Sequence, residues 1–196
     1  AACDIEFKFP FGFKELEGIH SRTDFDLSQH EKFSGKKLRY FDPESKESYV
    51  PYVIETSIGL DRMFLSILTA SYQEEELEND SKRLVLKIPV FLAPFKAAIL
   101  PLVNKDGLDE MANKLYEELR PFLNVTIDEK DAIGRRYRRQ DAIGTPVCIT
   151  IDHDSLKHHS VTFRLRDTME QFRVDLNSVR KELFKLTNPS NFLHQK

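Results

Sequence analysis

The chain has 196 residues, of which 40% are hydrophobic and 31% are charged, and its formal net charge is −3. This composition predicts a soluble globular protein with one large or two small domains, and no apolar run approaches the ~20 residues of a membrane span. The negative charge argues against a protein that wraps nucleic acid nonspecifically, although it permits a local basic face.

The cysteines and the first residues bear on the compartment. Cys3 and Cys148 lie far apart in the sequence, without the spacing of a metal site, which indicates reduced thiols. The start, Ala1-Ala2-Cys3-Asp4, has no basic region followed by an apolar one, so we expect no signal peptide. We therefore expect a cytoplasmic protein with no membrane partner and no DNA partner.

The first elements in the chain are a strand and a charged segment. Between residues 4 and 13 apolar residues alternate with polar ones until Pro10 and Gly12 interrupt, which predicts a half-buried antiparallel strand. Its phenylalanines are better explained as sheet core than as a platform for stacking bases. Residues 14–27 are rich in charge but threaded with apolar side chains. They form either a solvated surface or the lining of a cleft, and chemistry alone favours the surface.

The next stretch predicts a hairpin, a strand and a helix. Residues 36–41 and 47–54 flank the turn signal Asp42-Pro43-Glu44-Ser45, so we expect a hairpin that delivers Glu55. Residues 51–70 then change from β-branched and aromatic residues to apolar residues at spacings of three and four, which predicts a strand followed by a helix. Polar side chains collect at the junction, where the helix has free N–H groups, and such a junction can hold a charged ligand.

Residues 72–83 are acidic and have few apolar anchors, which indicates a connection between domains. Its carboxylates are those of Glu74, Glu75, Glu76, Glu78 and Asp80.

From residue 84 onward strands and helices alternate. We predict strands at 97–103, 125–127 and 146–151, with helices at 108–119, capped by Asp106, and at 134–143. This order implies parallel strands with right-handed crossovers. Residues 160–166 and 168–174 should add an antiparallel hairpin, and a final helix should begin near Asp175. The sheet is therefore expected to be mixed.

Two conspicuous motifs have plain structural explanations. His153, His158 and His159 lie in what reads as a loop, no third distant ligand is indicated, and we expect no metal site there. The run of four arginines around Tyr137 should point in several directions on a helix, so at most half of it can face one partner. Part of that run should pair with Asp131, Asp141 or the acidic connection.

Gly59-Leu60-Asp61-Arg62, Glu55-Thr56-Ser57 and the block from Glu15 to Leu27 resemble glycyl-tRNA synthetases of the dimeric, class II type. The first of these runs is similar to motif 3 of class II synthetases, with Thr56 where that family often has proline. Without this resemblance, Arg62 could be a helix-start arginine paired with Asp61, and Glu15 and Glu55 could be sheet-surface carboxylates.

The resemblance implies roles for several side chains. Arg62 would bind the γ-phosphate of ATP, and the glycine pocket would be built by four residues: Glu15, Arg22, Glu55 and Ser57. Arg62 and Glu55 would be the catalytic residues. Glu17 could help with ATP or Mg²⁺, which the complete enzyme would use together.

Residues 92–101, 134–146 and 164–171 resemble the anticodon-binding domain of the same synthetases. The resemblance implies contacts with tRNA(Gly) through Arg138, Arg164 and Arg166. The alternation of Leu165 with Val161 and Phe163 indicates that Leu165 itself is buried.

These observations predict an α+β fold followed by an α/β fold. Residues 1–83 would be the C-terminal part of a class II catalytic domain, with a partial antiparallel sheet and an acidic linker. Residues 84–196 would be an anticodon-binding domain with a mixed five-stranded sheet flanked by helices.

The resemblance implies a glycine–tRNA ligase that forms glycyl-adenylate and that is a homodimer when complete. We find no motif 1 and no motif 2 in this sequence, so we expect a C-terminal fragment that is inactive alone. The alternative is a non-catalytic synthetase-like accessory module that binds nucleic acid or protein. A third possibility, an unrelated ATP-binding α/β protein, would not explain the second domain.

Overall fold

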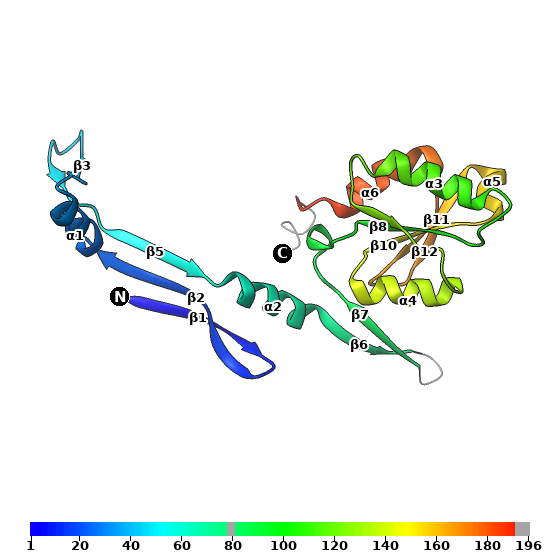
Figure 1. Ribbon diagram of the computed structural model, residues 1–196, viewed down its shortest axis with the longest axis horizontal. Helices are drawn as coiled ribbons and strands as arrows, with labels where there is room; N and C mark the ends of the chain where they lie inside the picture. The colour runs from blue at the N-terminus through cyan, green and yellow to red at the C-terminus, as the bar shows by residue number, and fades with distance from the viewer. Residues whose placement is uncertain (78–80, 191–196) are drawn as a thin grey trace. The chain divides into compact units, whose positions relative to one another are not determined.

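A computed structural model describes residues 1–77 and 81–190. The chain divides into two compact units, Ala1–Thr69 (unit 1) and Ala70–Lys196 (unit 2), which are coloured from blue to red along the chain in Figure 1. The sequence predicted a boundary at residue 83, and the structure places it before the acidic segment. Among the described residues, no helix has the length and apolar character needed to cross a membrane.

Unit 1 is built on a three-stranded antiparallel sheet in the order β1-β2-β5. Its elements are β1 (Ala2–Phe9), β2 (Gly12–Thr23), α1 (Phe25–Ser34), β3 (Tyr40–Phe41), β4 (Ser48–Tyr49), β5 (Val53–Ile58) and α2 (Leu60–Ser71). The predicted passage from a strand into a helix is confirmed by β5 and α2, and Gly59 alone separates them. The sequence did not predict α1, because this helix buries no residue and so has no apolar stripe.

The predicted N-terminal strand is present, but most of the phenylalanines expected in the sheet core are exposed. Phe9 is 3% exposed, whereas Phe11 and Phe13 are 64% and 61% exposed. Phe9 is the one hydrophobic side chain of unit 1 that is buried among the described residues. The assignment of these phenylalanines to a sheet core was therefore wrong for Phe11 and Phe13, because the described part of unit 1 supplies no second layer over them.

The predicted turn at residues 42–45 is confirmed, although its strands are short. The Asp42 carboxylate accepts hydrogen bonds from the Glu44 N–H at 3.0 Å and from the Ser45 hydroxyl at 2.8 Å. β3 and β4 pair over only two residues each, with Tyr40 opposite Tyr49. Side-chain bonds within the turn therefore define this hairpin more than its strands do.

Unit 2 contains the predicted mixed five-stranded sheet, in the order β12-β11-β10-β8-β9. β8 runs parallel to β9 and β10, and β10, β11 and β12 are antiparallel to one another in turn. Its elements are β6 (Tyr72–Glu76), β7 (Lys82–Leu86), η2 (Val90–Leu92), β8 (Ala97–Pro101), α3 (Leu108–Leu119), β9 (Val125–Ile127), α4 (Ile133–Ile143), β10 (Val147–Ile151), α5 (His153–His158), β11 (Ser160–Leu165), β12 (Gln171–Asp175), η3 (Leu176–Ser178) and α6 (Val179–Thr187).

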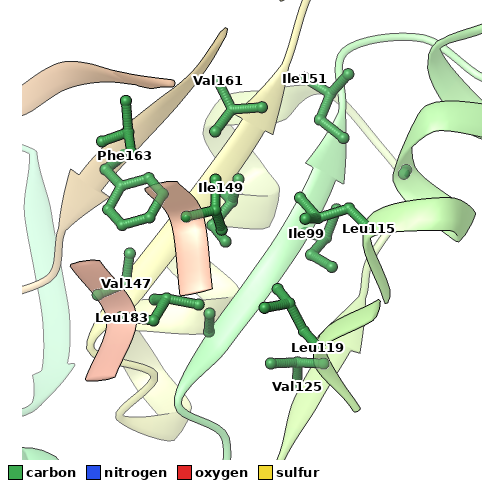
Figure 2. Packing of buried hydrophobic residues seen from close by; sticks show 14 of the residues in the cluster. Ile99, Leu115, Leu119, Val125, Val147, Ile149, Ile151, Val161, Phe163 and Leu183 are labelled. Carbon is green, nitrogen blue, oxygen red and sulfur yellow. The ribbon is translucent and has the colours of Figure 1, made fainter. Parts of the chain in front are cut away.

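The main core of unit 2 lies on one face of this sheet. α3 and α6 pack on that face, and α4 covers the other (Figure 1). Figure 2 shows Ile99 and Ile149 of the parallel strands close to Leu115 of α3 and Leu183 of α6. All four side chains are almost completely buried, so the sheet and both helices form one rigid body.

Three local predictions for unit 2 were wrong. The acidic connection instead forms the antiparallel hairpin β6–β7, although Glu78 and Asp80 lie outside the described residues. Asp106 does not cap α3, since its φ is +63° and Gly107 occupies the cap position. The histidine segment is the helix α5, because Asp152 and Ser155 form a reciprocal capping box at its start.

One glycine inside α4 and one directly after it lead to opposite stability predictions. Gly144 ends the helix at φ +84°, and an added Cβ would lie 3.0 Å from the Ile88 side chain and 3.0 Å from the Leu86 carbonyl oxygen. We expect Gly144→Ala to lower the free energy of unfolding by at least about 1–2 kcal/mol. At Gly134 an added Cβ meets nothing within 4 Å, so Gly134→Ala should raise it by about 0.5–1 kcal/mol. Urea unfolding measures both values, and shifts of the same sign would contradict the prediction.

Candidate functional site

Arg62 lies in the first turn of α2, directly after the end of β5. Its Nη1 donates a hydrogen bond to the main-chain carbonyl oxygen of Glu15 at 2.6 Å. An open hollow of about 570 Å³ lies here, and Glu15, Ser57, Asp61 and Arg62 are among the residues that line it. The strand end, the helix start and β2 therefore bring three of the predicted site residues together.

Arg22 and Glu55 form a second group. The Arg22 Nε lies 3.5 Å from Glu55 Oε2. It lies closer, at 2.7 Å, to Asp26 Oδ2, and Nη2 is 3.0 Å from the other oxygen of Asp26. These hydrogen bonds raise the pKa of the Arg22 guanidinium and lower the pKa of the Asp26 carboxyl. The sequence analysis missed Asp26, although its spacing of four residues from Arg22 was visible.

The register of the sheet shows which of these side chains share a face. In unit 1, Glu55 lies opposite His20, and Ser57 lies opposite Gly18. Opposed residues of antiparallel strands point to the same face, so Glu55, Ser57 and His20 lie on one face. Glu17 lies opposite Ile58 and therefore points to the other face. The suggested role of Glu17, help with ATP or Mg²⁺, therefore stays a prediction for a side chain on the face opposite to Ser57.

Gly18 makes room for a histidine on that shared face. The His20 Nε2 lies 3.7 Å from Asp4 Oδ1. A Cβ added to Gly18 would lie 3.2 Å from the same nitrogen, which is tighter than an ordinary contact. A larger residue at position 18 would therefore displace the imidazole from its place over the strand.

We expected Arg22, Glu55 and Arg62 to share one hollow, and the structure instead places Arg22 and Arg62 in different hollows. Arg62 lines the hollow that contains Glu15 and Ser57, whereas Arg22 lines another hollow with His20. Glu15, which was expected beside Arg22, lies instead with Arg62. The individual roles of these side chains remain predictions.

Unit 2 places the predicted tRNA-binding arginines mostly in its interior. Arg164 is 4% exposed, and its Nη1 and Nη2 donate to the two oxygens of Asp141 at 2.8 and 3.0 Å. Arg166 is 2% exposed and donates to the carbonyl oxygens of Leu86 and Gly144. Their guanidinium groups are occupied inside the unit, so a direct tRNA contact by Arg164 or Arg166 is not supported.

The arginines of α4 also have partners. Arg135 and Arg139 pair with Asp131, and Arg138 is exposed with its Nη1 3.8 Å from Asp141 Oδ2. Pairing of part of this run with Asp131 and Asp141 is therefore confirmed. Arg136 is buried instead and donates to the carbonyl oxygens of Pro101, Leu102 and Asp128.

Arg83 completes a buried charged cluster that the sequence analysis missed. Its side chain is fully buried, and its Nε lies 3.4 Å from both Asp141 Oδ2 and Glu75 Oε2. Its Nη2 donates to the carbonyl oxygen of Arg166. The sequence analysis assigned Arg83 to an acidic connection between domains. In the structure it occupies a buried position of β7 that apolar residues usually fill.

Comparison with known families indicates the class of domain in unit 2. Residues 96–186 match the family described as "Anticodon binding domain", so unit 2 contains an anticodon-binding domain. The chain also superposes on the RNA binding domain of threonyl-tRNA synthetase from Cryptosporidium parvum Iowa II, with a TM-score of 0.69. That alignment covers 97% of this chain and 44% of the other at 22% identity, and it shows the fold alone.

The curated relatives of the whole chain are glycine–tRNA ligases. The chain is 52% identical over 181 residues to a glycine–tRNA ligase of Borrelia hermsii, which covers 91% of this chain and 41% of that protein. It is 53% identical over 185 residues to the glycine–tRNA ligase of Bacillus cereus, with 94% and 40% covered. The chain is therefore similar to glycine–tRNA ligases over most of its own length, and it spans about two-fifths of the length of these relatives.

The buried cluster predicts unequal roles for two arginines. Arg164→Ala leaves the buried carboxylate of Asp141 without its two-oxygen partner and should lower the free energy of unfolding by about 3–5 kcal/mol. Arg138→Ala removes an exposed, more distant partner of the same carboxylate and should cost at most about 1 kcal/mol. Urea unfolding measures both variants, and equal losses would show that Asp141 does not depend on Arg164.

Proposed function

We propose that this chain takes part in the ATP-dependent charging of tRNA(Gly) with glycine, in the cytoplasm. The observation that carries the proposal is the hollow at the start of α2, where Arg62 lies against Glu15 beside Ser57. It supports a site for the ATP phosphates and glycine in unit 1. The anticodon-binding domain of unit 2 supports a partner role for tRNA.

Arg62 suits the binding of a phosphate group. One of its terminal nitrogens is used by the Glu15 carbonyl oxygen, which fixes the direction of the guanidinium. The remaining N–H groups can donate to phosphate oxygens in a forked geometry. They stand at the N-terminus of α2, where free main-chain N–H groups also favour an anion. Arg62 would therefore hold the γ-phosphate in a fixed position for in-line attack at the α-phosphate.

The same hollow fits Mg²⁺ that arrives with ATP. Mg²⁺ is commonly bound by one or two carboxylates together with substrate phosphates, and Glu15 and Asp61 both line the hollow. When bound, the ion would neutralise part of the phosphate charge. In this arrangement Glu15 would help to bind Mg²⁺-ATP and would not contact glycine.

Glycine would be held on the neighbouring part of the same sheet face. Glu55 can accept hydrogen bonds from the ammonium of glycine, and charge-assisted bonds of this kind contribute about 1.5–3 kcal/mol. Arg22 lies 3.5 Å from that carboxylate and can orient it. Ser57 is two residues further along β5, toward the hollow of Arg62. Selection of glycine would then rest on exclusion of side chains, since a crowded pocket rejects a methyl group sterically.

A second candidate is the non-catalytic accessory module. It is favoured by the separation of Arg22 and Arg62, which line different hollows. A module of this kind would bind tRNA without using either hollow. It would act without forming part of a complete homodimeric enzyme. Nucleotide binding by the chain distinguishes the two candidates.

We expect the chain to bind Mg²⁺-ATP, and Arg62→Ala should weaken that binding at least about tenfold, because it removes charge-assisted hydrogen bonds to phosphate. Arg39→Ala is the matched control, since Arg39 is an exposed arginine of unit 1 paired with Glu31 at 3.1 Å. Isothermal titration calorimetry measures both variants. Equal affinities for wild type and Arg62→Ala would contradict the assignment, and no binding by wild type would favour the accessory module.

We also expect no glycine-dependent pyrophosphate exchange by this polypeptide alone, because its sequence lacks the motif 2 arginine that would bind the α-phosphate. Radiolabelled pyrophosphate incorporation into ATP, with and without glycine, measures the reaction. Glycine-dependent incorporation above the level of a heat-denatured sample would refute this expectation.

A further inference from the structure

A pocket of about 490 Å³ lies in unit 2 between α3 and the η3–α6 segment. Its floor is formed by Leu115, Leu119 and Val179, which are buried in the main hydrophobic core. The exposed side chains of Lys114, His159 and Arg180 also line it. Because both helices pack on the sheet (Figure 1), these basic groups are displayed from a rigid surface.

The two cations of this pocket have no carboxylate partner. Neither Lys114 nor Arg180 forms an ion pair with any residue in the described part of the chain, and Glu118 is the one acidic residue that lines the pocket. On the other face of the sheet, Arg135 and Arg138 of α4 each have a carboxylate oxygen within 4 Å. Lys114 and Arg180 therefore offer positive charge that no carboxylate of the described residues pairs with, whereas Arg135 and Arg138 of α4 each have such a partner.

An exposed aromatic ring stands beside the pocket. Phe122 follows α3 and is 54% exposed, and the guanidinium carbon of Arg180 lies 4.8 Å from the centroid of its ring. A flat pair of this kind offers a stacking surface to an unpaired base. A cationic pocket next to a stacking surface matches one nucleotide of single-stranded RNA, with its phosphate in the pocket and its base outside.

We propose that this pocket binds a backbone phosphate of tRNA, held by Lys114 and Arg180, while the adjacent base stacks on the Arg180–Phe122 pair. The proposal rests on the proposed function, because it requires that unit 2 binds tRNA. Lys114, Phe122 and Arg180 all lie within the residues that match the anticodon-binding family. The phosphate contact adds affinity without base specificity, and stacking selects unpaired over paired nucleotides.

The test is tRNA(Gly) binding by the full chain, measured by filter binding across a series of salt concentrations. Lys114→Ala/Arg180→Ala should weaken binding at low salt about tenfold or more. It should also reduce the slope of log K against log[salt] by about 0.7 to 0.9, the contribution of one phosphate contact. Lys105→Ala/Lys130→Ala removes the same charge outside the pocket and should change the slope much less.

The base contact is tested separately. Phe122→Ala should weaken binding of tRNA(Gly) several-fold and leave the salt slope unchanged, because it removes stacking without removing charge. An unchanged affinity would overturn the stacking part of the proposal. Thermal unfolding of each variant should match wild type, since these side chains are exposed.

The possible failures are distinct. If the wild-type chain binds no tRNA, the proposed function fails. If wild type binds but Lys114→Ala/Arg180→Ala behaves like its lysine control, tRNA binding stands and the phosphate pocket is overturned.

Discussion

Asp141 is fully buried in unit 2, and its carboxylate meets the guanidinium groups of Arg164 and Arg83. Moving such a charge out of water costs several kcal/mol, which must be offset by close partners. The three residues come from α4, β11 and β7, so this one carboxylate ties a helix, the antiparallel part of the sheet and the β6–β7 hairpin together. The buried cluster thus explains why the acidic segment belongs to unit 2 and is not a free linker.

The need of buried charges for close partners also limits which arginines of unit 2 can contact RNA. A guanidinium that is buried and bonded to a carboxylate or to carbonyl oxygens cannot also face RNA phosphate. Arg136, Arg164 and Arg166 are used in this way, and the exposed arginines of α4 are largely balanced by aspartates. The pocket between α3 and α6 differs because its cations have no such partner. The positions of basic residues in the sequence therefore do not show which of them are free to contact RNA phosphate.

Unit 1 has the opposite character, since its polar groups are exposed and its apolar side chains are mostly uncovered. What organises it is the register of β2 against β5, which sets Glu55 opposite His20 and Ser57 opposite Gly18. The turn from β5 into α2 then directs Arg62 back to the carbonyl oxygen of Glu15. Two neighbouring groups result, Arg62 with Glu15 and Arg22 with Glu55, for which we propose phosphate and the glycine ammonium as ligands.

The sequence by itself determined most of the strands and helices of the five-stranded sheet, the strand-to-helix junction at residue 59 and the mixed character of that sheet, because hydrophobic period and turn chemistry act over a few residues. It did not indicate α1, the β6–β7 hairpin or α5. Runs such as Glu55-Thr56-Ser57 and Gly59-Leu60-Asp61-Arg62 also indicated the similarity to glycine–tRNA ligases that the comparisons then showed. Only the tertiary structure decided that Arg164 and Arg166 are internal, that Glu15 lies with Arg62, and that Lys114 and Arg180 line one pocket. Those facts depend on partners that are distant along the chain: Arg164 and Asp141 are 23 residues apart, and Arg62 and Glu15 are 47 apart. A local pattern can indicate that a side chain points inward, but it cannot identify the group that it will meet there.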